Sequence, residues 1–150
     1  MAIRNMRFRD DEALRKRCRP VDEVTDAVRR QLDDMMDTLH ATDNGAALAA
    51  PQVGILRRLV VIDFEGYYLK LVNPVIVEKE GVQDCVEGCL SFPNVFGTTI
   101  RPMRVVVEAL DENGQPVRFD VDGDMAKCFC HEIDHLDGIV FTDHVIEYLN

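Results

Sequence analysis

The sequence predicts an α+β protein in which antiparallel β-sheets surround a C-terminal helix, with an amphipathic helix near the N-terminus. Short runs rich in β-branched residues fill the middle of the chain, and one helical pattern lies on each side of them. The segments between the runs are too short for helical crossovers, which favours antiparallel pairing. No repeat, low-complexity tract or linker divides the 150 residues, so we expect a single domain over residues 1–150.

The expected elements follow from hydrophobic periodicity and from turn residues. The first helix is expected over 22–42, with Asp22 as a cap and Asn44-Gly45 as the stop. Strands are expected over 59–62, 68–72, 75–77, 105–107 and 117–119. Turns between them are expected at Glu65-Gly66, Glu80-Gly81 and Asn113-Gly114. The second helix is expected to begin near residues 122–124 and to end at Gly138.

Charge, apolar runs and cysteine usage exclude several classes of protein. The 27 acidic and 17 basic residues give a net charge of −10, and such a surface repels phosphate backbones, so nucleic acid is not an expected partner. No apolar run approaches the roughly 20 residues of a membrane span, and no signal peptide is visible, so we expect a cytoplasmic protein. Five cysteines, an odd number, exclude a complete disulfide framework within the chain and indicate a reducing compartment.

The sharpest motif is His131-Glu132-Ile133-Asp134-His135. Positions i and i+4 share one face of a helix, so both imidazoles can bind one divalent ion, with Glu132 beside it. The alternative is a solvated helix that carries two histidines by chance. Neither common protease pattern supplies a third ligand, because residue 141 is Phe and only 15 residues follow His135. A third ligand is therefore expected upstream.

Cys89, in the segment Glu87-Gly88-Cys89-Leu90-Ser91, is the candidate for that ligand. One thiolate and two imidazoles leave an open coordination position, as a catalytic metal site requires. The alternative for a lone cysteine is a small buried hydrophobe, and this interpretation applies to Cys85, Cys128 and Cys130. A four-cysteine zinc site formed by these three and Cys89 is a further alternative, although the spacings differ from those of structural zinc knuckles.

A third segment, residues 45–54, is rich in small residues and contains one side-chain amide, that of Gln52. Small residues allow a ligand to approach the backbone closely. The alternative is a packing turn with an exposed glutamine. In this order, the three segments resemble the motifs of the peptide deformylase family over nearly the whole chain. The resemblance implies removal of the N-formyl group from N-formylmethionyl nascent polypeptides, with release of formate.

The family resemblance also implies roles for individual residues. Cys89, His131 and His135 would bind one divalent ion, with Fe(II) as the native metal and Zn(II), Ni(II) or Co(II) also able to occupy the site. Glu132 would be the general base and acid for the metal-bound water that attacks the formyl carbon. The Gln52 side-chain amide and the Leu90 backbone N–H would stabilise the oxyanion.

The same resemblance places the peptide beside Gly45, Ala46, Ala47, Leu48, Glu87 and Gly88, with the Ala46 backbone pairing with it as an added strand. Glu87 and Arg101 match positions that form a supporting ion pair in the family, the alternative being two solvated charges.

Four residues depart from the family pattern. Ala47 replaces a glycine, Cys130 replaces a glutamine, Asp124 occupies an often apolar helix position, and Phe96 stands where some members have an arginine. These departures bear on substrate preference, and Ala47 and Asp124 leave open the alternative of a metalloamidase for another N-acyl peptide. A separate alternative is an inactive peptide-binding paralogue. The acidic segment 139–150 predicts weak or no docking of the C-terminus on the ribosome.

Overall fold

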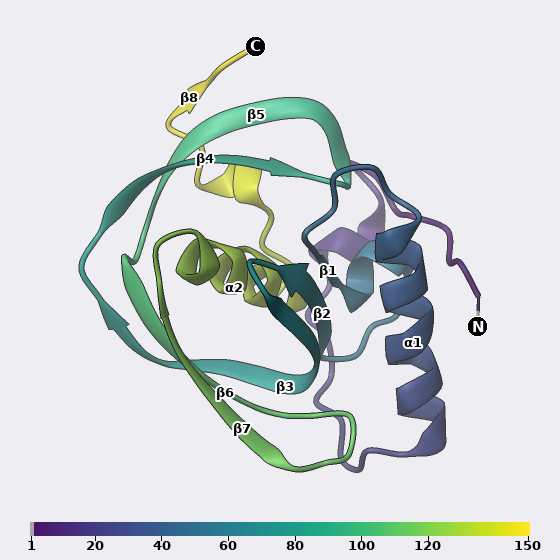
Figure 1. Cartoon of the computed structure of the whole chain (residues 1–150). Coiled ribbons are helices and arrows are strands. Elements are labelled where there is room, and N and C mark those ends of the chain that lie inside the picture. The colour runs from purple at the N-terminus through teal and green to yellow at the C-terminus, as the bar shows by residue number, and fades with distance from the viewer. Residues whose placement is uncertain (1) are drawn as a thin grey trace.

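The computed structural model describes residues 2–150, which form two α-helices, three short 3-10 helices and eight strands (Figure 1). The helices are η1 (Glu12–Arg15), α1 (Asp26–His40), η2 (Ala50–Val53), α2 (Gly123–Leu136) and η3 (Phe141–Asp143). The strands are β1 (Ala47–Ala49), β2 (Leu59–Phe64), β3 (Tyr67–Glu80), β4 (Gln83–Cys89), β5 (Phe92–Arg101), β6 (Arg104–Leu110), β7 (Pro116–Asp122) and β8 (Glu147–Tyr148). None of the helices within residues 2–150 is long and apolar enough to cross a membrane.

The strands form two antiparallel sheets, which confirms the predicted fold class. The larger sheet has the order β1-β2-β3-β6-β7, and the smaller has the order β4-β5-β8. The expected turn glycines Gly66, Gly81 and Gly114 all adopt positive φ angles between strands, a backbone conformation that glycine adopts without strain.

Two of the expected strands, 68–72 and 75–77, are one continuous strand, β3. Asn73 and Pro74 look like a strand end, and Asn73 has a φ of +53°. A register shift against β6 accommodates both residues, and the Asn73 side chain bonds the Val21 backbone N–H and C=O, each at 2.8 Å. The irregularity is therefore a bulge, which bends the strand without ending it.

Helix α1 is shorter than expected at both ends. Thr25, rather than Asp22, caps it, because the Thr25 hydroxyl accepts a hydrogen bond from the Val28 N–H at 3.3 Å. Its last residue is His40 rather than residue 42. The periodic apolar residues of the helix pack as expected against one face of the larger sheet, in a cluster with Leu59 and Val61.

Helix α2 packs on the opposite face of the larger sheet, where the alternate β2 residues Val60 and Ile62 contact it. It begins at Gly123 and ends at Leu136, and Gly138 follows with a φ of +75°. In Figure 1, α2 lies between the larger sheet and the β4–β5 hairpin. The helix that carries the histidine motif is therefore enclosed by both sheets.

Strands β4 and β5 are absent from the sequence-based expectations, and only residues 90 and 91 separate the two strands. Along both strands, buried and exposed side chains alternate, but polar residues occupy buried positions and apolar residues occupy exposed ones. The buried positions include Glu87, Thr99 and Arg101, while Val86 and Ile100 are exposed. A pattern with charged residues on the inner face does not match the usual rule of apolar residues inside and polar residues outside.

Candidate metal centre

Cys89, His131 and His135 come together although they belong to different parts of the fold. Cys89 is the last residue of β4, and the two histidines lie one turn apart on α2. Their possible ligand atoms all lie within 4.8 Å of one another, and the Cys89 Sγ is 3.4 Å from the His135 Nε2. The two imidazole centroids are 5.1 Å apart. These distances bring one sulfur and two nitrogen donors to a common point.

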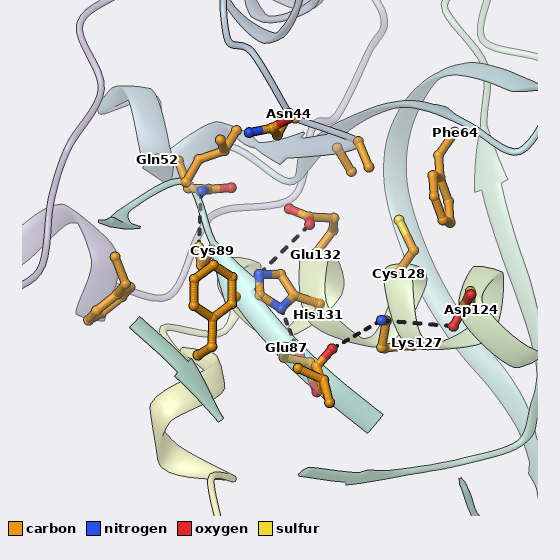
Figure 2. A pocket seen from close by; sticks show the side chains of 18 of the residues that line it. Asn44, Gln52, Phe64, Glu87, Cys89, Asp124, Lys127, Cys128, His131 and Glu132 are labelled. Atoms are coloured by element: carbon orange, nitrogen blue, oxygen red, sulfur yellow. Dashed lines mark hydrogen bonds and ion pairs between the residues drawn. The ribbon is translucent and has the colours of Figure 1, made fainter. Parts of the chain in front are cut away.

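Glu87 fixes the orientation of His131. The His131 Nδ1 lies 2.8 Å from the Glu87 Oε1, so its Nε2 is available on the other side of the ring (Figure 2). Such a bond sets the tautomer and ring angle of a metal-binding histidine. Glu87 in turn accepts from the Arg101 Nε at 2.7 Å and Nη2 at 2.9 Å, and from the Thr99 hydroxyl. The expected pair of Glu87 and Arg101 is present, and it is buried rather than solvated.

The ionic network continues from Arg101 to the surface. The Arg101 Nη1 donates to the Asp134 Oδ2 at 2.7 Å, and the same oxygen is 3.2 Å from the His144 Nε2. Burial alone would raise the pKa of Glu87, but the hydrogen bonds from His131 and Arg101 and the Arg101 charge outweigh it and hold this pKa well below its usual range. Glu87 is therefore a carboxylate acceptor at neutral pH.

Glu132 stands beside His131 at the cavity wall, with its Oε2 3.9 Å from the His131 Nε2 (Figure 2). Its side chain is buried, and within residues 2–150 its Oε1 has no hydrogen-bond partner. Burial raises the pKa of Glu132 to about 7, against the opposing effect of the neighbouring His131 charge. A buried carboxyl group with one free oxygen beside the histidine ligands is suited to proton transfer.

The Gln52 amide is held in a fixed orientation beside Cys89. Its Oε1 accepts from the Ala49 N–H at 2.9 Å, and its Nε2 lies 3.1 Å from the Ser91 Oγ and 3.5 Å from the Cys89 Sγ. The side chain is buried rather than exposed. Leu90, the next residue after Cys89, lines the same cavity as Gln52. Ser91, which the sequence motif contains but to which no role was assigned, takes part in positioning this amide.

A cavity of about 500 Å³ opens beside these groups. Gly45, Ala46 and Ala47 line one side of it, and the segment 86–90 lines the other. The Ala46 carbonyl accepts from the Asp63 N–H at 2.9 Å, which extends the β1–β2 pairing by one residue. Leu48 does not line the cavity, because it is fully buried in the cluster on the α1 side of the sheet. This expected peptide-contacting residue is thus part of the core.

Further lining residues were not identified as contact residues from the sequence. Phe64 and Cys128 line the inner part, and Lys127 bridges two elements through a hydrogen bond from its Nζ to the Val86 carbonyl at 3.2 Å (Figure 2). The Lys127 Nζ also lies 3.8 Å from an Asp124 carboxylate oxygen. The departures Asp124 and Phe96 both line the cavity, whereas the side chain of Cys130, a residue of α2, is buried in the core.

The cysteines divide as expected. All five are unbridged, and Cys18, Cys85, Cys128 and Cys130 are buried. Burial raises the thiol pKa of each of these four, to about 11 for Cys18 and Cys130. Across residues 2–150, the three-residue group with Cys89 is the only cluster of histidine, cysteine and acidic side chains with the geometry to hold a metal ion, so the four-cysteine alternative is wrong.

The residues present fit a catalytic metal ion. One thiol sulfur and two imidazole nitrogens are the donors that zinc and iron accept in proteins, and three protein ligands leave positions for water and substrate. The Glu132 carboxyl group lies beside this donor set rather than within it, with its Oε2 3.9 Å from the His131 Nε2 and its Oε1 without a hydrogen-bond partner in residues 2–150. The arrangement therefore combines a metal-binding group with a separate acid–base group at one wall of a cavity.

Comparison with known proteins agrees with this geometry. Residues 3–149 match the family of polypeptide deformylases. The chain is 61% identical to peptide deformylase 2 of Clostridium acetobutylicum over 99% of each chain. It is 50% identical to a peptide deformylase of Acetivibrio thermocellus, over 100% of this chain and 88% of the other. Its fold matches the crystal structure of a Thermotoga maritima peptide deformylase with a TM-score of 0.93 and 34% identity, over 97% and 99% of the two chains. The chain therefore belongs to the polypeptide deformylase family of metal-dependent hydrolases.

Proposed function

We propose that this chain hydrolyses the N-formyl group of N-formylmethionyl polypeptides. One water is consumed, the bond between the formyl carbon and the methionine nitrogen breaks, and formate and a free amine are released. The single observation that carries the proposal is that Gln52, Cys89, His131 and Glu132 line one cavity. The Gln52 amide lies beside Cys89, Glu132 lies beside His131, and the His135 Nε2 is 3.4 Å from the Cys89 Sγ.

Cys89, His131 and His135 are the proposed ligands of one divalent ion. When bound, this ion supplies Lewis acidity, which lowers the pKa of a water and polarises a carbonyl group. A thiolate with two imidazoles suits Fe(II), which we propose as the native ion, and also accepts Zn(II), Ni(II) or Co(II). Glu87 supports this role because it holds His131 by its Nδ1 and leaves the Nε2 free.

Glu132 is the proposed proton carrier. It accepts a proton from the attacking water and delivers it to the nitrogen of the leaving methionine. The Gln52 Nε2 and the Leu90 N–H are the proposed donors to the formyl oxygen as negative charge develops on it. For this step Gln52 exchanges its bond to the Ser91 hydroxyl for one to the substrate, while its bond from the Ala49 N–H keeps the amide in place.

The peptide is proposed to lie between two walls of the cavity. Gly45, Ala46 and Ala47 supply backbone groups on one side, and Glu87 and Gly88 border it on the other. Strand β1 pairs with β2 along one edge, so a peptide added as a further strand fits its other edge. The methyl group of Ala47 narrows this path and favours substrates with an unhindered backbone.

The test is formate release by protein purified without oxygen and loaded in turn with Fe(II), Ni(II) or Co(II). We expect release from formyl-Met-Ala-Ser, no acetate from acetyl-Met-Ala-Ser, and loss of turnover in Glu132→Ala with metal retained. Absence of formate with all three metals would refute the proposal. Comparable hydrolysis of the acetyl peptide would instead assign the chain to a broader class of metalloamidases.

A further inference from the structure

The β4–β5 hairpin has an apolar face that points to solvent. Three residues on that face, Val86, Phe96 and Ile100, are 53%, 47% and 52% exposed. The opposite face of the same hairpin carries Glu87 and Arg101, both buried. Antiparallel sheets with one solvated face normally show the reverse arrangement. Contiguous apolar side chains on a surface are typical of interaction sites rather than of ordinary solvent faces.

This outer face, which we define as Val86, Phe96 and Ile100, is continuous with the cavity. Val86 and Phe96 both belong to the cavity lining. The Phe96 ring lies directly on Gly88, since a Cβ added to Gly88 would be 2.7 Å from the Phe96 Cε1. Ile100 lies four residues further along β5, about 13 Å away at roughly 3.3 Å per residue. The face therefore leads from the cavity rim outward over about four residues of extended chain.

We propose that this outer face binds apolar side chains of the substrate polypeptide downstream of its second residue, and so determines which nascent chains are preferred. The inference rests on the proposed function. A peptide whose first residue fills the cavity must leave it along one of the walls, and Val86 and Phe96 are the exposed large apolar residues of that lining. Side chains of alternate residues in an extended peptide then reach the face as far as Ile100.

The charges near the face favour an apolar and non-acidic occupant, because Lys127, the cation that bonds the Val86 carbonyl, already lies 3.8 Å from an Asp124 carboxylate oxygen. On the outer positions of β4 and β5 in the stretches 84–88 and 96–100, Asp84 is the only charged residue, and it pairs directly across from Ile100. The neighbouring β8 residue Glu147 pairs with Thr98 and adds a second carboxylate. Acidic substrate residues would meet these carboxylates, so we expect them to be disfavoured.

Three peptides that share formyl-Met-Ala test the proposal: one continues Leu-Ser-Leu, one Ser-Ser-Ser and one Glu-Ser-Glu. Two leucines would bury apolar area on the face, so we expect kcat/KM for the leucine peptide to exceed kcat/KM for the serine peptide on the order of tenfold. The difference should lie mainly in KM, and the glutamate peptide should have the lowest kcat/KM. Ile100→Thr and Phe96→Ser should each lower the leucine-to-serine ratio. Val75→Thr, on an equally exposed valine of β3, is the matched control and should keep the wild-type ratio.

The test compares kcat/KM for the leucine and serine peptides within one protein sample, so a variant's overall loss of activity does not affect the ratio. A wild-type ratio near one, or a ratio that Ile100→Thr and Phe96→Ser leave unchanged, would overturn the docking inference while the proposed function stands. Failure to release formate from any peptide would overturn both. Sedimentation at the assay concentration tests whether a second copy of the chain, rather than the substrate, occupies the face. A wild-type dimer that Ile100→Thr dissociates would assign the face to a second copy and overturn the proposal.

Discussion

Replacing Arg101 by methionine tests whether the buried network behind His131 stabilises the fold. Arg101 is 5% exposed, and its guanidinium makes two hydrogen bonds to Glu87 and one to Asp134. Methionine retains much of the side-chain volume and removes the charge. Glu87, itself 3% exposed, then remains as a buried carboxylate with only Thr99 and His131 as donors. The variant therefore isolates the loss of charge compensation from the loss of packing.

The expected cost is large because one partner of a buried pair is removed. Such changes typically cost about 3–5 kcal/mol, since the remaining charge is buried without compensation. For a chain of this length, 1 kcal/mol corresponds to roughly 2–4 °C in Tm, so we expect Tm to fall by about 10 °C. Displacement of Glu87 also loosens His131, and we expect metal affinity to fall roughly 10- to 100-fold.

Urea denaturation of the chelator-treated protein measures the change in the free energy of unfolding without a contribution from bound metal. Arg104→Met is the matched control: Arg104 contacts three carboxylates, of Glu78, Glu80 and Asp120, but at the surface, where solvent screens the charges, so its loss should cost far less than that of Arg101. Adding Glu87→Gln to Arg101→Met should recover part of the lost stability. Equal effects of Arg101→Met and Arg104→Met would refute the reasoning.

Three further predictions concern the site and the acid stability of the chain. Glu132→Gln should retain stoichiometric metal by elemental analysis while formate release falls by at least about 100-fold; unchanged turnover would remove Glu132 from proton transfer. Cys89→Ala should lose both metal and activity, and one tightly bound ion with normal turnover would contradict the proposed ligand set. Burial alone would raise the pKa of Asp34, but hydrogen bonds from Arg4 and the Ala2 N–H outweigh it and lower this pKa. Because the charged form is favoured in the fold, Asp34 stabilises it above the unfolded pKa of about 3.9, and this contribution is lost as the pH falls through the lower folded pKa. The stability difference between the wild type and Asp34→Asn should therefore be present near pH 6 and vanish in strong acid, as urea midpoints would show; a difference independent of pH would contradict the assignment.

The periodic parts of the fold could be predicted because their burial follows the usual rule. The apolar faces of α1 and α2 and most strands of the larger sheet are visible in the sequence for this reason. Strands β4 and β5 are not, because their buried positions include Glu87 and Arg101, which satisfy each other only after the hairpin has formed. The cap at Thr25 depended on one local hydrogen bond, for which Asp22 was an equally plausible residue.

The candidate site could likewise be predicted only in part from the sequence. The metal-binding group could be predicted because the two histidines are fixed by helix geometry and Cys89 by its motif. Leu48 was expected beside the substrate because of the family resemblance, and the sequence alone did not indicate on which face of a strand its side chain lies. In the structure it belongs to β1, where side chains alternate: Ala47 and Ala49 face the α2 cluster and Leu48 faces the α1 cluster. Asp134 and Thr99 joined the network through tertiary contacts that sequence spacing does not encode.

Cys89 lies on the β4–β5 hairpin and the two histidines lie on α2, and this separation affects how the hairpin is held to the helix. Neither of the two main apolar clusters takes a buried residue from 83–101, so the β4–β5 hairpin is attached to α2 mainly through polar groups. The ion that we propose to be held by Cys89 and the two histidines would act as a cross-link that closes a long loop of chain and tethers the hairpin to the helix. Oxidation of Cys89 would remove that tether together with one proposed ligand, so redox damage at a single sulfur would loosen one wall of the cavity.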